Sequence, residues 1–219
     1  MQRFPLNRKG WQSIVLVVSV IAVVVMRFNR TTPSTTDQGP SAPAKTERRI
    51  PQHQGTWQHL TGCTLVEEDR NNDGDSFTLR HGGEEFTFRL YYADCPEKRR
   101  HQYNGDRIAE QGQYFGGLSE AATIAVGQEA RDFTLALLRK GPVSVDTRWE
   151  EVYDSGRRYA FVSSGGVDLA EALVGRGLAR IHTKGVSRPG GLSIQDEKAK
   201  LQQLERGAKA KRLGAWGKK

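Results

Sequence analysis

The sequence predicts an α+β fold, in which a small Greek-key β-barrel is covered by helices on one side. Two patterns support this: the first half is rich in β-branched and aromatic runs, and several later segments carry apolar residues at helical spacing. The third observation is size, because 219 residues with 37% hydrophobic side chains suffice for one real core. We therefore expect one medium-sized domain with extensions rather than two domains.

The N-terminal segment, residues 1–30, predicts insertion into a membrane. It contains no acidic residue, and basic residues flank an apolar run over residues 14–26. Extended to residues 11–28, this run gives about 27 Å of helix, just enough for a bilayer core. An uncleaved anchor is favoured over a cleaved signal peptide, because the Arg-Phe-Asn-Arg sequence after the run is a poor cleavage site. We expect a single-pass cell-membrane protein with its folded domain outside the cytoplasm, and secretion after cleavage is the alternative.

Residues 31–52 predict a flexible tether. Thr, Ser, Pro, Gln and Ala dominate this segment, and it has too few bulky side chains to form a core. The folded domain is therefore expected over residues 53–219.

The central feature of the domain is a predicted hairpin with charged residues around its open end. Ser76–Arg80 and Glu85–Tyr91 are β-branched and aromatic runs, separated by a His-Gly-Gly turn. Arg89 lies within the second run, where an apolar residue is usual. Four acids lie just outside the runs: Asp73 and Asp75 before the first, Asp94 and Glu97 after the second.

These residue types in this pattern point to phosphodiester chemistry. Crowded carboxylates repel one another, and a hard divalent cation with oxygen ligands offsets that repulsion. A guanidinium provides a planar fork that fits two phosphate oxygens. Cation, arginine and a spare carboxylate together can hydrolyse a phosphodiester. Asp73-Gly74 alone is better explained as turn chemistry, so the prediction depends on the whole set.

Periodicity and capping residues predict the other elements. Strands are expected within Gly55–Glu68, Val143–Trp149, Tyr159–Ser163 and Leu178–Ile181. Helices are expected at Ser119–Lys140, at Asp168–Arg176 and after Ser193, which makes about three. The polar segment after Glu97 should pass beside the site, and residues 107–116 predict only one short helical turn. Within it, Arg107 and Glu110 read as an ordinary surface pair.

Three motifs resemble the staphylococcal nuclease (thermonuclease-like) family. They are D-G-D-S-F, F-R-L-Y-Y-A-D-C-P-E and S-G-R-R-Y-A-F-V, and the second is highly specific. The resemblance runs from about Cys63 to Trp216. It implies an OB-fold with a five-stranded barrel and three helices. It also implies a calcium-dependent endonuclease that cleaves DNA and RNA and leaves 3′-phosphates.

The resemblance also implies a set of metal ligands. Asp75 and Asp94 match the calcium-binding acids, and Asp73 matches a weaker or outer ligand. Cys95 stands where the family commonly has threonine, and its backbone carbonyl is the expected ligand. No zinc site is expected, because the histidines lack metal-ligand spacing.

Catalytic roles follow from the same resemblance. Glu97 matches the general base on the attacking water, with orientation of that water as the alternative role. Arg89 and Arg157 match the two arginines that hold the phosphoryl group, and the adjacent Arg158 is the alternative to the second. Tyrosines that the family places beside the substrate base are absent here; the positions hold Ser155 and Thr183, and the candidate substitutes are Tyr153, Tyr159 and Tyr103.

Charge favours a polyanionic partner without identifying it. The chain has 33 Lys and Arg residues against 25 Asp and Glu, a formal net charge of +8. Nucleic acid is the expected substrate, and we expect a monomer. An inactive nuclease-like module that binds nucleic acid or protein, and a protein that binds anionic envelope polymers, are the alternatives. Cys63 and Cys95 either form a disulfide or stay as free thiols.

Overall fold

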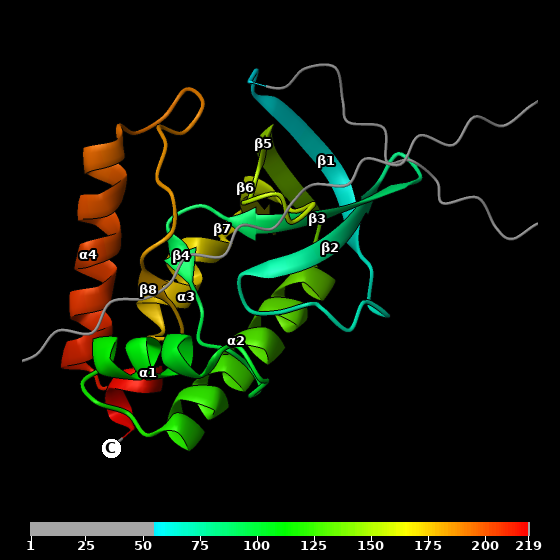
Figure 1. Cartoon of the computed structure of the whole chain (residues 1–219). Helices are drawn as coiled ribbons and strands as arrows, with labels where there is room; N and C mark the ends of the chain where they lie inside the picture. Colours follow the sequence, from blue (N-terminus) through cyan, green and yellow to red (C-terminus); the bar gives the residue numbers. More distant parts are fainter. Residues whose placement is uncertain (1–54, 219) are drawn as a thin grey trace, which may run out of the picture. The chain divides into compact units, whose positions relative to one another are not determined.

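The computed structural model describes residues 55–218 and shows a β-barrel with helices packed against it (Figure 1). The expected anchor at residues 1–30 and the expected tether at residues 31–52 lie outside the described residues. None of the helices between residues 55 and 218 is long and apolar enough to cross a bilayer.

The barrel consists of five strands closed by a contact between segments far apart in the chain. The described residues contain eight strands: β1 (Gln58–Leu65), β2 (Ser76–His81), β3 (Glu84–Leu90), β4 (Ala93–Asp94), β5 (Val143–Glu151), β6 (Arg158–Ser164), β7 (Val167–Asp168) and β8 (Arg180–Ile181). The five that form the barrel are β1, β2, β3, β5 and β6. In the main sheet the order is β3-β2-β1-β5-β6-β7, and a parallel pairing of β3 with β6 closes the barrel. β4 and β8 form a separate antiparallel pair beside it. This closed barrel fits the expected OB-type α+β fold.

The predicted hairpin is confirmed, and its register places the site. β2 and β3 pair from His81↔Glu84 at the turn to Ser76↔Arg89 at the open end. On its other side Arg89 pairs with Tyr159 of β6. Arg89 therefore lies at the seam where the barrel closes, between two strands rather than at an edge.

The core fills the inside of the barrel. Phe77, Leu79, Phe88, Val145 and Val162 come from four strands and are all buried, with at most 1% of each residue exposed. The alternation of apolar and polar positions along β5 gives the inward side of that strand, as period-two patterning requires. The functional end of the barrel thus rests on a rigid, well-packed scaffold.

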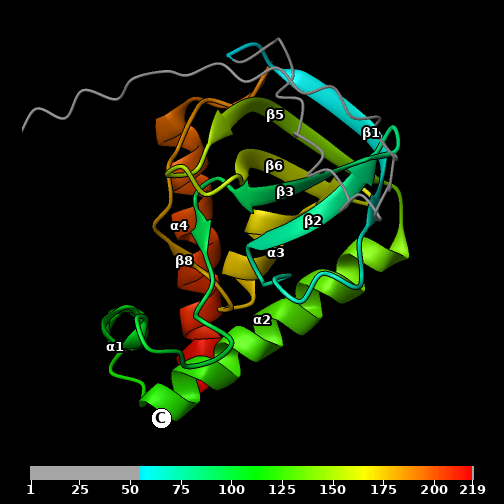
Figure 2. The ribbon, with the colours of Figure 1, turned by 45° about the vertical axis from the view of Figure 1, so that its right-hand side comes forward.

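The helices are α1 (Gly105–Tyr114), α2 (Glu120–Lys140), α3 (Leu169–Gly175), α4 (Ile194–Ala210) and the short 3-10 helix η1 (Gly214–Gly217). The expected cap of α4 is present, because the hydroxyl of Ser193 accepts the N–H of Asp196. The hydroxyl of Ser119 caps α2 in the same way by accepting the N–H of Ala122. α2 passes beneath the barrel, and α1 lies beside the first part of α2 (Figure 2).

The prediction of only one short helical turn over residues 107–116 is wrong, because this segment lies largely within α1, a helix of ten residues. The described chain therefore has four α-helices instead of about three. A polar helix of this length is marginal by its own propensity, and it forms here through tertiary packing. Its buried side carries Ile108, Gln111 and Gly112.

The two cysteines are free and buried, so the structure has the thiol alternative rather than the disulfide. Burial raises the pKa of both thiols, which keeps them protonated and unreactive. Cys95 packs against Gly74, where an added Cβ would lie 2.7 Å from the cysteine sulfur. The loops that carry Asp73, Asp75 and Asp94 are therefore in direct contact.

α2 supports the loops of the site through a close approach. A Cβ added at Gly127 would lie 2.5 Å from the carbonyl oxygens of both Pro96 and Glu97. Thr134, two turns further along α2, donates its hydroxyl to the carbonyl oxygen of Gly74 at 2.7 Å. Only a residue without a side chain allows the Glu97 segment to lie this close to the helix.

Gly127→Ala is therefore expected to destabilise the domain by about 1–3 kcal/mol, the usual cost of overpacking. On helix propensity alone, alanine would stabilise by about 1 kcal/mol, so the sign of the change is informative. Gly207→Ala in α4 is the matched control, because an added Cβ there meets nothing within 4 Å. Urea unfolding of both variants measures the difference, and equal stabilisation of both would contradict the close approach.

Candidate active site

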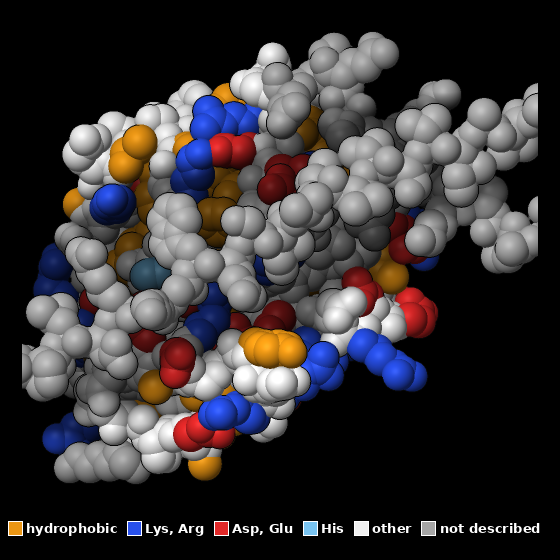
Figure 3. All heavy atoms as spheres, in the orientation of Figure 1, with side chains coloured by type: hydrophobic (Ala, Val, Ile, Leu, Met, Phe, Trp, Pro, Cys, Tyr) orange, Lys and Arg blue, Asp and Glu red, His pale blue; other side chains and the backbone are white. Residues whose placement is uncertain are grey.

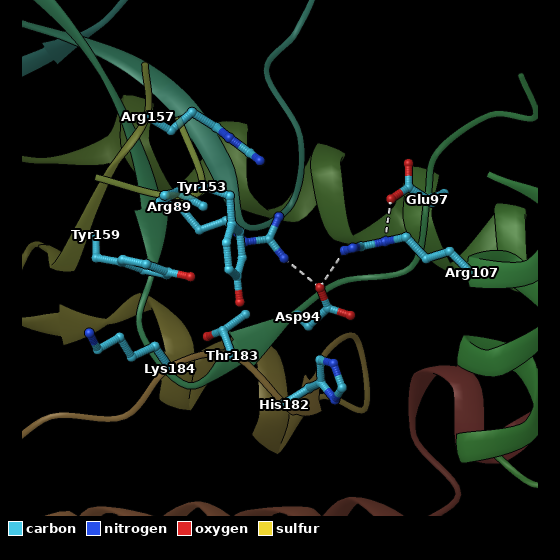
Figure 4. Close-up of a pocket in the computed structure, with 11 residues that line it drawn as sticks. Arg89, Asp94, Glu97, Arg107, Tyr153, Arg157, Tyr159, His182, Thr183 and Lys184 are labelled. Atoms are coloured by element: carbon cyan, nitrogen blue, oxygen red, sulfur yellow. Dashed lines mark hydrogen bonds and ion pairs between the residues drawn. The ribbon is translucent and has the colours of Figure 1, made fainter. Parts of the chain in front are cut away.

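A cavity of about 270 Å³ opens where β3, β4 and α1 meet the β5–β6 turn and the segment after β8 (Figure 4). Its lining is mostly charged or aromatic and consists of Arg89, Asp94, Glu97, Arg107, Val152, Tyr153, Arg157, Tyr159, His182, Thr183 and Lys184. One cavity is thus shared by the three predicted catalytic residues and one predicted metal ligand, namely Arg89, Glu97, Arg157 and Asp94. Asp73, Asp75 and Cys95 do not line it.

Arg89 links two of the expected metal ligands. Its Nη1 donates to Asp75 Oδ1 at 2.9 Å and to Ser76 Oγ at 3.3 Å, and its Nη2 donates to Asp94 Oδ1 in a short contact. Only 10% of the Arg89 side chain is exposed. Burial alone would lower the pKa of Arg89, but Asp75 and Asp94 raise it above its usual value. The fixed guanidinium therefore brings the two carboxylates together.

Asp94 receives more positive charge than the sequence predicts. Besides Arg89, its oxygens accept from Arg107 Nη2 at 2.6 Å, Arg180 Nε at 2.7 Å and Gln111 Nε2 at 3.1 Å. Burial would raise the pKa of Asp94, but the three guanidinium groups lower it. A carboxylate has about four acceptor positions, so these four donors leave Asp94 saturated.

Asp73 and Asp75 have the opposite electrostatic character. Asp75 Oδ2 accepts the N–H of Cys95 at 2.6 Å, and Asp75 is almost fully buried. Burial raises the pKa of Asp75, and Arg89 offsets this only in part. Burial and the charge of Asp75 raise the pKa of Asp73 to about 7. Burial on this side of the site therefore favours the protonated form of these two carboxyl groups.

The fit of these residues to a calcium ion is uneven. A hard cation with oxygen ligands would stabilise the ionised form of Asp73 and Asp75, which burial disfavours. Asp94 already has four donors, and the carbonyl oxygen of Cys95 accepts Gln111 Nε2 at 3.0 Å. Within residues 55–218, no group of three or more acidic, histidine or cysteine side chains is arranged around a common metal position. A cation that used Asp94 would replace one of its guanidinium partners.

Glu97 faces the cavity and is held from three directions. Its Oε1 lies 2.7 Å from Arg107 Nε, and its Oε2 lies 3.4 Å from Asn104 Nδ2. Its backbone N–H donates to Gln111 Oε1 at 3.1 Å. The N–H of Arg107 Nε is not directed at an acceptor, so its contact with Glu97 is an ion pair rather than a hydrogen bond. The Glu97 carboxylate is therefore held at the wall of the cavity.

Arg157 enters the cavity from the side opposite Arg107 (Figure 4). Its Nη1 lies 3.3 Å from Ser76 Oγ, and its Nε donates to Ser155 Oγ at 3.1 Å. No carboxylate within residues 55–218 forms an ion pair with it. Arg158 does not line the cavity and pairs with Glu151 at 3.1 Å. Of the two adjacent arginines, only Arg157 is free to meet an anion in the cavity.

The tyrosines around the site are distributed unevenly. Tyr153 and Tyr159 line the cavity, whereas Tyr103 does not. Tyr153 is 88% exposed and has a left-handed backbone with φ of 44°. Thr183, also in the lining, donates its hydroxyl to the carbonyl oxygen of Leu90 at 3.0 Å. An exposed ring at the cavity mouth suits contact with a planar group.

Sequence reasoning missed Arg107, Gln111 and Arg180. The expected surface pair between Arg107 and Glu110 is wrong, because Arg107 contacts the site and Glu110 pairs with Arg180 at 2.9 Å. Helical spacing of Asn104, Arg107 and Gln111 was the available signal for a shared face. Nothing local marks Arg180, which reaches Asp94 only through the pairing of β8 with β4.

The closed barrel and the charged cavity define a nuclease-type fold. A family model described as "Staphylococcal nuclease homologue" matches residues 87–218, more than half of the chain. The chain belongs to the family of staphylococcal nuclease homologues. The matched range includes Arg89, Asp94, Glu97 and Arg157, whereas Asp73 and Asp75 precede it. No curated protein matches the chain.

Proposed function

We propose that this protein is a calcium-dependent endonuclease that hydrolyses phosphodiester bonds in DNA, RNA or both and leaves 3′-phosphates. The observation that carries the proposal is the shared cavity of Arg89, Glu97 and Arg157, in which two guanidinium groups and one carboxylate face the same space. Basic and acidic side chains are interspersed on the face shown in Figure 3, so the cavity is the better candidate for phosphate recognition.

Each residue has a specific role in the proposed reaction. Arg89 and Arg157 hold two phosphoryl oxygens and offset the charge that develops on the phosphorus centre in the transition state. Glu97 accepts the proton of the attacking water. Pro96, directly before it, has a fixed φ angle and so helps to hold the direction of the Glu97 carboxylate. Tyr153 contacts the substrate base at the cavity mouth.

Asp75 and Asp94, with the carbonyl of Cys95, would hold the calcium ion, and Asp73 would act from the outer shell. Bound there, a divalent cation polarises a phosphoryl oxygen and makes bound water more acidic. The contact between the loops that carry Asp73, Asp75 and Asp94 supports this assignment, because it brings these carboxylates close together. Use of Asp94 requires that one of its guanidinium groups moves.

The saturation of Asp94 favours a second candidate function. If its three arginines stay in place, the chain is an inactive nuclease-like module that binds nucleic acid or protein. The two candidates differ in whether added calcium interacts with the domain at all.

The expected cellular arrangement is also a proposal. We propose that residues 53–219 form the nuclease domain and that residues 31–52 tether it to an anchor at residues 11–28, with the domain outside the cytoplasm. The apolar run and its basic flanks support the anchor. N-terminal sequencing of protein from the membrane fraction tests whether the segment is retained.

One experiment separates nuclease from binding module. Purified protein is given labelled single-stranded DNA or RNA with calcium, and then with a chelator. We expect cleavage only with calcium, 3′-phosphate ends, and loss of cleavage by about 10²-fold or more in Glu97→Gln, which removes the proton acceptor. Glu85→Gln, which changes an exposed acid of β3 away from the cavity, is the matched control.

A second measurement does not depend on activity. At a calcium concentration of 100 times Kd, binding stabilises the folded state by about 2.7 kcal/mol, which a melting curve detects. Binding of nucleic acid without cleavage and without a calcium-dependent melting shift would establish the inactive module and overturn the proposal.

A further inference from the structure

The side of α1 that faces the site carries three polar residues that contact the segment Asp94–Glu97. They are Asn104 at the helix start, Arg107 one turn later and Gln111 one turn after that. Glu110 on the same helix pairs with Arg180, which itself contacts Asp94. α1 therefore holds this segment directly and through Arg180, although the helix contributes nothing to the barrel.

Gln111 fixes the backbone of the segment. Its side chain is fully buried and makes three hydrogen bonds. The amide oxygen accepts the N–H of Glu97 at 3.1 Å, and the amide nitrogen donates to the Cys95 carbonyl at 3.0 Å and to Asp94 Oδ2 at 3.1 Å. A buried amide with this many partners determines one orientation of the chain, because any other orientation leaves polar groups unpaired.

Arg107 acts on the side chains rather than on the backbone. Its Nη2 contacts Asp94 Oδ1 at 2.6 Å while its Nε lies 2.7 Å from Glu97 Oε1. One guanidinium thus holds both carboxylates toward the cavity (Figure 4). The Arg107 side chain is 40% exposed, whereas those of Arg89 and Arg180 are 10% and 3% exposed. Arg107 is therefore the partner of Asp94 that can be removed with the least disturbance of the core.

We propose that α1 is a positioning element of the active site, in which Gln111 and Arg107 set the direction of the Glu97 carboxylate. The expected effect on the reaction rate rests on the proposed nuclease function. The claim that α1 fixes the position of the Asp94–Glu97 segment does not. Arg107 is a positioning residue, since it reaches the reaction through Glu97. Misplacement of a reacting group by about 1 Å can cost 10²-fold in rate, which sets the scale of the expected effect.

The test compares Arg107→Ala and Arg107→Lys with Arg139→Ala, an exposed arginine of α2 that pairs with Glu67 away from the cavity. We expect Arg107→Ala to lower kcat by about 10- to 100-fold with little change in KM. Arg107→Lys should recover part of the loss, because it restores one charge but not the fork. Arg139→Ala should match the wild type.

The position of Glu97 is also measured without catalysis. Amide hydrogen exchange, followed in the peptide that covers residues 92–99, should be faster in Arg107→Ala and faster still in Gln111→Leu. Exchange in β6 should not change in Arg107→Ala. Faster exchange limited to residues 92–99 supports the positioning role, whether or not the wild-type protein cleaves nucleic acid. If the wild-type protein cleaves nothing, only the nuclease proposal fails.

Three outcomes would overturn the inference. A higher KM with unchanged kcat in Arg107→Ala would mean that Arg107 binds substrate instead of positioning Glu97. A higher rate together with tighter calcium binding, measured by titration calorimetry, would mean that Arg107 blocks Asp94. Unchanged exchange in both α1 variants would overturn the structural part directly.

Discussion

Arg89→Ala is expected to reduce kcat/KM by about 10³-fold or more, because it removes a fixed guanidinium from the phosphoryl group. The same substitution should lower the free energy of unfolding by about 3–5 kcal/mol, since it leaves buried carboxylates without their shared partner. Asp75 and Asp94 have 4% and 1% of their side chains exposed, so water cannot replace that partner. Cleavage assays and urea unfolding measure the two effects separately.

Arg89→Lys separates charge from geometry. Lysine keeps the positive charge beside Asp75 and Asp94 but cannot donate to both from one planar fork. We expect most of the stability to return while cleavage stays low. Arg80→Ala is the control on the same hairpin, because Arg80 is exposed and its ion pair with Glu85 contributes at most about 1 kcal/mol. An Arg89→Ala protein that folds and cleaves within tenfold of wild type would contradict the assigned role.

Local signals were sufficient for the elements that depend on neighbouring residues. The His-Gly-Gly turn and the two apolar runs predicted the hairpin, and its register follows from the turn. Ser193 marked the start of α4 because a hydroxyl at the N-cap satisfies a backbone donor. These features are encoded within a few residues of one another.

The missed features depend on contacts between distant parts of the chain. The closure of the barrel pairs Arg89 with Tyr159, and neither strand alone indicates its partner. α1 was not predicted as a full helix, because the residues on its inner face that contact the site are polar. A segment with this composition looks like a solvated loop. A helix whose inner side is polar lacks the apolar stripe by which amphipathic helices are recognised in a sequence.

The sequence placed Arg89 and Asp94 together but did not indicate how many positive groups surround Asp94. The motifs placed Asp94 near Arg89, and the structure confirms that they are in contact. They gave no sign that Arg107 and Arg180 would converge on the same carboxylate from α1 and β8. Asp94 therefore has three guanidinium partners, Asp75 has one, and Asp73 has no arginine partner among the described residues.

Arg157→Ala is expected to reduce kcat/KM by about 10²- to 10³-fold with little loss of stability. Arg157 has no carboxylate partner within residues 55–218, so its removal leaves no buried acid unpaired. Burial and the nearby charge of Arg89 both lower the pKa of Arg157, which means that the folded protein holds this cation at some cost. An anion in the cavity would offset that cost. Removal of the Arg157 side chain removes the cost altogether, so the variant should not be less stable for this reason.

Arg158→Ala is the matched comparison, since the two arginines are adjacent. Successive side chains of an extended chain point to opposite sides, so only one of them can reach the cavity. Arg158 pairs with the partly exposed Glu151, so its loss should change stability little and leave cleavage within a few fold of wild type. The reverse result, with cleavage lost in Arg158→Ala and kept in Arg157→Ala, would place the phosphate on the other side of the strand. Cleavage retained in both variants would leave Arg89 as the sole phosphate-binding guanidinium and remove the basis for a two-arginine site.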